Sequence, residues 1–114
     1  MDGGGRVVRC ERVTTIRGDH PSLAGHFPGR PVVPGVVLLQ EVLEVVRGVL
    51  PAELTVTGLP VVKFSSPLKP DECVTIEVKG DAAAHAMFSC RVGQRLIASG
   101  VVELAPRAAH VEGV

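Results

Sequence analysis

Hydrophobic and polar positions divide the chain into short segments that predict strands and one helix. β-Branched and other apolar residues are concentrated in residues 6–16, 54–64, 73–78, 84–92 and 96–104. Such runs, bounded by glycine, proline and aspartate, are typical of strands. We therefore expect five strands, of which the last four follow one another as a meander.

Residues 35–50, with the sequence GVVLLQEVLEVVRGVL, form the segment with a helical pattern. Gly35 stands at its entry, and Pro51 stops it. Its few polar positions are Gln40, Glu41, Glu44 and Arg47. Because a helix so apolar needs a cover and the rest of the chain offers only strands, we predict an α+β fold, with a long central helix wrapped by a curled antiparallel sheet of about five strands.

Residues 17–34, between the first strand and the helix, contain three glycines and four prolines. This composition excludes regular structure and favours a stiff, ordered loop. Loops of this length in a small domain are usually functional or disordered, and the prolines argue for a fixed conformation. We expect the functional site to begin here.

The length of 114 residues predicts a single domain over residues 1–114, with a core at about residues 6–105 and frayed termini. Twelve basic residues balance twelve acidic ones. This balance provides no strong positive field for nucleic acid or for an anionic membrane. We therefore expect neither as a partner.

Cysteine usage and the N-terminal residues indicate a cytoplasmic protein. The three cysteines are odd in number and widely spaced, which argues against a disulfide framework and a zinc site. Cys73 and Cys90 lie in strand segments, and we expect both to be buried, inert thiols. Residues 1–10 contain no apolar stretch of an export signal, and the longest apolar run, residues 36–39, is too short to cross a bilayer.

Two ordered blocks resemble a known family. The segment GHFPGRPVVPGVVLLQ at residues 25–40 is similar to the active-site signature of the hotdog-fold 3-hydroxyacyl-acyl-carrier-protein dehydratases. The segment VKFSSPLKPDECVTIEV at residues 62–78 resembles the strand and turns of the same family. The resemblance covers residues 18–104 and implies a hotdog fold. The chain is shorter than the housekeeping members, which indicates a compact, pathway-specific relative.

The resemblance also implies roles for individual residues. The histidine at the position of His26 removes the proton α to the thioester carbonyl, a task that suits an imidazole at neutral pH. The backbone N–H of Gly35 polarises the carbonyl at the helix N-terminus. The substrate-binding candidates are Gly35, Phe27, Pro34, Val36 and Arg30.

The chain departs from the family at the second residue of the site. Family members have an acid fourteen positions after the histidine, and here this position is Gln40. A carboxamide has no proton to donate. Glu44 lies one helical turn further on the same face, so we hypothesise that Glu44 replaces the acid while Gln40 orients the hydroxyl. Two alternatives stay open: Glu44 pairs with Arg47, or Gln40 marks a non-catalytic relative.

The resemblance therefore implies dehydration of a 3-hydroxyacyl thioester to a trans-2-enoyl thioester in fatty acid or related acyl-chain biosynthesis. The substrate is carried on phosphopantetheine, with an acyl carrier protein or coenzyme A as the partner, and no metal or redox cofactor is required. Family members pair as homodimers or larger homo-oligomers, with the histidine and the acid of each site coming from different subunits. The alternatives are a hotdog acyl thioesterase and a non-catalytic thioester- or carrier-binding module.

Overall fold

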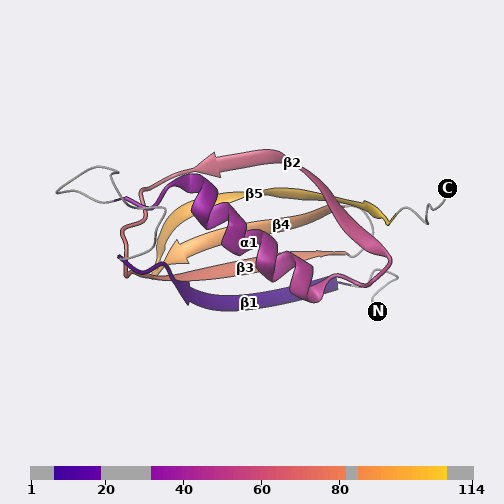
Figure 1. Ribbon diagram of the computed structural model, residues 1–114, viewed down its shortest axis with the longest axis horizontal. Coiled ribbons are helices and arrows are strands. Elements are labelled where there is room, and N and C mark those ends of the chain that lie inside the picture. Colours follow the sequence, from indigo (N-terminus) through magenta and orange to yellow (C-terminus); the bar gives the residue numbers. More distant parts are fainter. Residues whose placement is uncertain (1–6, 19–31, 82–84, 108–114) are drawn as a thin grey trace.

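A computed structural model describes residues 7–18, 32–81 and 85–107 of the chain, and the statements below concern these residues (Figure 1). The elements in chain order are β1 (Val7–Thr15), α1 (Gly35–Val49), β2 (Leu54–Phe64), β3 (Cys73–Asp81), β4 (His85–Val92) and β5 (Arg95–Pro106). The predicted helix and all five predicted strands are present. The largest differences lie at the ends of β3 and β5, which continue beyond the apolar runs.

The strands form one antiparallel sheet in the order β1-β3-β4-β5-β2. The predicted four-strand meander is wrong for β2, because only β3, β4 and β5 are consecutive neighbours. β1 pairs with the free edge of β3, and β2 pairs with β5 at the opposite edge. The connection over residues 65–72 therefore carries the chain from one side of the sheet to the other.

Helix α1 crosses one face of this sheet, and its apolar side packs against it (Figure 1). The buried helix residues are Val37, Leu38, Val42, Val45 and Val46. Their spacing places them on one side of the helix. The helix ends where the Leu50 N–H donates to the Val46 carbonyl at 3.1 Å, directly before Pro51.

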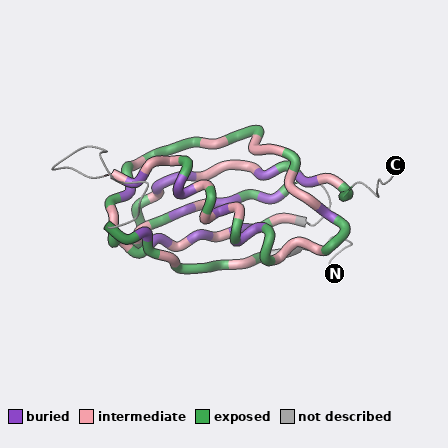
Figure 2. The backbone as a smooth tube through the Cα atoms, viewed as in Figure 1, coloured by how far each residue is buried: buried purple, intermediate pink, exposed green. Residues whose placement is uncertain are grey.

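The inner face of the sheet supplies the other half of the core. Buried and less buried positions alternate along the central strands, as expected for strands with one covered face (Figure 2). The buried residues of β3 and β4 are Val74, Ile76, Val78, Ala86, Phe88 and Cys90. The whole core is aliphatic apart from Phe88 and Cys90, and no polar or charged residue among those described is buried.

The two strand cysteines differ in environment. Cys90 is fully buried, and the loss of hydration raises the pKa of its thiol to about 12. Cys73 is exposed, so the expectation that it is buried is wrong. It begins β3 at the end of the sheet, where its side chain accepts a hydrogen bond from the Thr15 hydroxyl at 3.6 Å.

Among the described residues, α1 is the helix of the fold, and it is too short to cross a membrane.

Candidate active site

A cavity of about 400 Å³ lies at the N-terminal end of α1. Its lining comes from the helix start, the end of β2, the following connection and β5. The lining residues are Val32, Val33, Gly35, Leu38, Phe64, Ser65, Ser66, Pro67, Leu68 and Ile97. Apolar side chains predominate, with two serines at one side, so the cavity suits an acyl chain that has a polar end.

The helix begins at this cavity without a side-chain cap. Pro34 precedes the helix in an extended conformation, with φ −59° and ψ 142°, and no described side chain bonds to the first turn. The Val37 N–H donates to the Pro34 carbonyl at 3.0 Å. The N–H groups of Gly35 and Val36 precede this first bond and have no acceptor within the helix. An apolar cavity thus meets N–H groups at the positive end of a helix dipole.

Phe64 touches the helix start from the opposite side of the cavity. A Cβ atom built on Gly35 would lie 2.6 Å from the Cζ atom of Phe64 and 2.9 Å from its Cε1 atom. The tip of the aromatic ring therefore occupies the space that any other residue at position 35 would need. Glycine leaves room for this close approach of an aromatic ring to the backbone, and any other residue would displace the ring.

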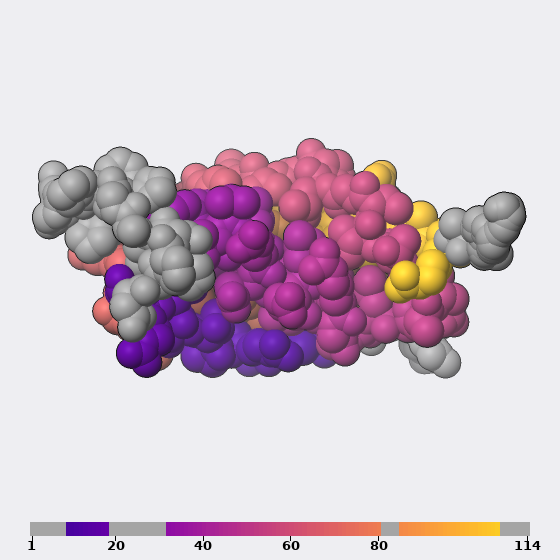
Figure 3. All heavy atoms as spheres, in the orientation of Figure 1, coloured from indigo at the N-terminus to yellow at the C-terminus, as the bar shows by residue number. Residues whose placement is uncertain are grey.

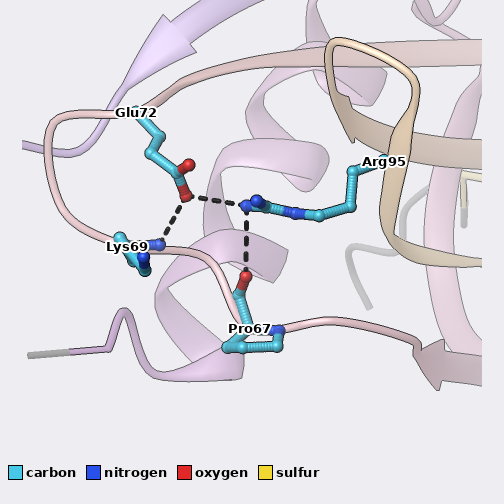
Figure 4. A network of polar contacts seen from close by, with 4 residues as sticks. All are labelled: Pro67, Lys69, Glu72 and Arg95. Atoms are coloured by element: carbon cyan, nitrogen blue, oxygen red, sulfur yellow. Dashed lines mark hydrogen bonds and ion pairs between the residues drawn. The ribbon is translucent and has the colours of Figure 1, made fainter. Parts of the chain in front are cut away.

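A polar network holds the connection that forms one wall of the cavity (Figure 4). The Arg95 Nη2 group donates to Glu72 Oε1 at 2.9 Å and to the Pro67 carbonyl at 3.4 Å. The Lys69 N–H donates to the same Glu72 oxygen at 2.9 Å. These bonds lower the pKa of Glu72, the backbone bond from Lys69 being the largest cause. They attach residues 67–72 to the turn between β4 and β5.

The same connection binds the end of the first strand. Asp71 adopts a left-handed conformation with φ 69°, which aspartate tolerates better than most residues. Its N–H donates to the Ile16 carbonyl at 2.8 Å, and its Oδ1 atom accepts from the Gly18 N–H at 3.0 Å.

The helix side of the loop is attached to the same place. The Val33 N–H donates to the Leu68 carbonyl at 2.8 Å. Gly18 and Val33, which flank residues 19–31, thus both bond to the connection over residues 65–72. His26, Phe27 and Arg30 belong to this segment and lie outside the described residues.

Val36, Gln40 and Glu44 form an exposed row along α1, separated by one turn each. Figure 3 shows this helix at the surface of the molecule. Gln40 and Glu44 line a second hollow of about 710 Å³, next to β1, and not the cavity at Gly35. No ion pair among the described residues joins Glu44 to Arg47, so the proposed pairing of these two side chains is not formed.

Of the predicted substrate-binding residues that the structure describes, Gly35 lines the cavity, whereas Pro34 and Val36 do not. The opposite wall was not predicted. Phe64, Ser65 and Ser66 follow one another at the end of β2, inside the second block that resembles the dehydratases. The block was thus a signal for these residues. Ile97, on the neighbouring strand, had no signal of its own in the sequence.

Comparison with known families identifies the chain. The model of the ApeI-like family, described as ApeI dehydratase, matches residues 7–101. The chain belongs to this family. A curated relative, the 3-hydroxyacyl-[acyl-carrier-protein] dehydratase FabZ of Chlamydia trachomatis, is 33% identical over 112 residues, covering 83% of this chain and 69% of the relative. The suspected resemblance to the dehydratases is confirmed.

Solved structures place this ApeI-like chain in the hotdog fold. The structure of the dehydratase heterocomplex ApeI:P from Xenorhabdus doucetiae matches with a TM-score of 0.75 and 21% identity, covering 85% of this chain and 87% of that one. An acyl-CoA hydrolase from Staphylococcus aureus matches with a TM-score of 0.65 and 13% identity, covering 89% of this chain and 64% of the hydrolase. The predicted hotdog fold is confirmed, and the second match shows that the fold also occurs in a hydrolase.

Proposed function

We propose that this ApeI-like chain dehydrates a 3-hydroxyacyl thioester, carried on an acyl carrier protein, to the trans-2-enoyl thioester. The observation that carries the proposal is the position of Gly35, which begins the helix at the wall of an apolar cavity. A thioester carbonyl placed there would accept hydrogen bonds from N–H groups that the helix leaves without a partner. The chain also belongs to a dehydratase family.

The proposed reaction transfers two protons, one from the substrate to a base and one from an acid to the leaving hydroxyl, and releases one water molecule. His26 removes a proton from Cα of the substrate, and the negative charge that develops on the carbonyl oxygen is stabilised by the Gly35 N–H. The Cβ–O bond then breaks, and the departing hydroxyl takes a proton from the acid. Gly18 and Val33, which flank the segment that contains His26, both bond to the connection that lines the cavity, and this supports a role for His26 at this site.

We assign the acid to Glu44 and the orientation of the hydroxyl to Gln40. Both side chains are exposed on one protomer, and they line a different hollow from Gly35. The assignment therefore includes a homodimer in which the His26 of one subunit meets the helix acid of the other. Exposure in the protomer leaves both side chains accessible to a partner subunit.

The test is the dehydration of a short 3-hydroxyacyl thioester, followed by the absorbance of the enoyl product. We expect turnover by the wild-type protein and a loss of about 10²- to 10⁴-fold in His26→Ala and in Glu44→Gln, the usual range for one proton-transfer group. Glu41→Gln is the matched control, since Glu41 lies on the same helix and accepts a hydrogen bond from the Thr14 hydroxyl at 3.4 Å. It should retain wild-type activity.

Turnover that survives Glu44→Gln and is lost in Gln40→Ala would contradict the assignment of the acid. Presenting the substrate both on an acyl carrier protein and on coenzyme A identifies the carrier. The release of free thiol instead of enoyl product would identify a thioesterase.

A second candidate is a non-catalytic module that binds an acyl thioester or its carrier protein. The observation that favours it is Gln40, a carboxamide at the position of the family acid. Binding of an acyl carrier protein that is unchanged by His26→Ala, without any turnover, would support this function.

The heterocomplex of the Xenorhabdus relative suggests a third arrangement. A second hotdog chain could pair with this one and supply the acid that Gln40 does not. Turnover that appears only after such a chain is added would distinguish the mixed dimer from the homodimer.

A further inference from the structure

The ring of Phe64 borders the cavity beside the helix start, on a strand whose backbone is held in place. Its backbone is held in the sheet, where Phe64 is paired with Ala98. The next residue, Ser65, donates its N–H to the Ile97 carbonyl at 2.8 Å. The side chain is nevertheless 52% exposed, because β2 is an edge strand. The ring thus lies between the cavity and the surface.

The ring also lies beside the space from which a substrate carbonyl must approach the N–H groups of the helix start. Every Cα–Cβ bond in a helix is tilted toward the N-terminus of the helix. The free N–H groups of the first turn point along the helix axis toward the same end. Because the Phe64 Cζ atom is only 2.6 Å from the ideal Cβ position of Gly35, the ring borders the place in front of these N–H groups.

We propose that Phe64 is a specificity-determining residue that excludes thioesters with a substituent on Cα. The inference rests on the proposed function, in which the thioester carbonyl bonds to the Gly35 N–H. The carbonyl carbon then lies close to the ring, and Cα is one bond further. An unbranched chain can continue into the cavity toward Leu38 and Ile97, which are 2% and 1% exposed. A methyl group on Cα would meet the ring.

This selection is possible because a 2-methyl-3-hydroxyacyl thioester can still be dehydrated. It retains one proton on Cα, so the removal of this proton and the loss of water give a 2-methyl-2-enoyl thioester with no other reactant. The two substrates therefore differ in shape at Cα and not in the type of reaction.

The test compares 3-hydroxyacyl thioesters with and without a 2-methyl group in the wild-type protein, Phe64→Leu and Phe64→Ala. One methyl or methylene group changes selectivity in an apolar pocket by about 10- to 200-fold. We expect the ratio of kcat/KM, branched over unbranched, to rise by about 10-fold or more in Phe64→Ala, and by less in Phe64→Leu. Met87→Ala is the matched control, because Met87 is 60% exposed and does not line the cavity. Its ratio should equal that of the wild type.

An equal ratio in the wild type and in Phe64→Ala would overturn the proposal. If the wild type turns over neither substrate, the binding of saturated acyl pantetheine analogues with and without a 2-methyl group replaces the assay. A wild-type preference for the unbranched analogue that Phe64→Ala removes would then support the role of Phe64 even though the dehydratase function fails. Equal binding of both analogues, or binding of neither, would overturn it.

Discussion

The need for glycine at position 35 comes from a neighbouring ring and not from the backbone angle. The described glycine with a positive φ is Gly93, in the turn between β4 and β5. Gly35 begins a regular helix, where alanine would fit the backbone well. The obstacle is Phe64, whose partly exposed ring could move outward.

We therefore expect Gly35→Ala to fold and to lose function. The cost of displacing the ring and the gain in helix propensity from alanine should largely cancel. The free energy of unfolding should therefore change by less than about 1 kcal/mol. Binding of an acyl thioester should fall by about 10-fold or more, because the shifted ring disturbs the carbonyl position. Denaturant unfolding and a binding titration measure the two effects separately.

The double variant Gly35→Ala/Phe64→Ala provides the control. If the two residues interact only through this contact, the double variant should bind as well as Phe64→Ala alone. If the losses of binding in the two single variants simply add in the double variant, Gly35→Ala does not act through the Phe64 ring.

Gly35 was predictable from its sequence context, whereas its partner was not. The helix pattern and the dehydratase signature both indicate residue 35. Phe64 belongs to a strand pattern, and this pattern does not predict that its side chain contacts the helix. The contact between them depends on where β2 lies in the sheet.

At the scale of elements, the connection between β2 and β3 depends on Glu72. Because its pKa is lowered from 4.5, first by the Lys69 N–H and then by Arg95, the carboxylate stabilises the folded state above pH 4.5. This stability is lost as the pH falls through the lowered pKa. The side chains of Glu72 and Arg95 keep 24% and 43% exposure, so the contribution is at most about 1 kcal/mol.

Glu72→Gln should accordingly flatten the acid side of the stability profile. The expected result is a loss of up to about 1 kcal/mol at neutral pH and a smaller difference from the wild type below pH 4. Denaturant unfolding at several pH values measures it. Glu53→Gln, at an exposed position before β2, is the control and should follow the wild-type profile. A Glu72→Gln curve parallel to the wild type would contradict the role of the charge.

Local sequence patterns predicted the bounds of the elements much better than they predicted which strands pair with each other. The helix was expected at residues 35–50 and occupies Gly35–Val49. β2 occupies the predicted residues, Leu54–Phe64. Its place beside β5 was not predicted, because an alternating pattern indicates which face of a strand is buried but not which strand lies next to it.

At the scale of the molecule, β1 and β2 form the two edges of the sheet. β2 has exposed apolar side chains at Val61 and Phe64, which are 53% and 52% exposed. Unpaired edges with apolar residues favour association. A second copy at β2 would also enclose the open side of the cavity, which Phe64 borders.

We expect the protein to sediment as a dimer at micromolar concentration. Val61→Glu places a charge on the β2 edge and should shift the equilibrium toward the monomer, which sedimentation velocity measures. Met87→Glu introduces the same charge at an exposed position of β4, which is not an edge strand, and should leave the dimer intact. A wild-type monomer, or equal dissociation of the two variants, would contradict an interface at β2.

The sequence by itself determined the α+β class, the strand and helix segments and the dehydratase family, because each depends on residues that are close along the chain. Hydrophobic periodicity acts over a few positions, and the two motif blocks are continuous. Only the tertiary structure decided the strand order, the exposure of Cys73 and the contact between Gly35 and Phe64. These features result from the packing of distant segments, where the choice of neighbour depends on the shape of the whole core.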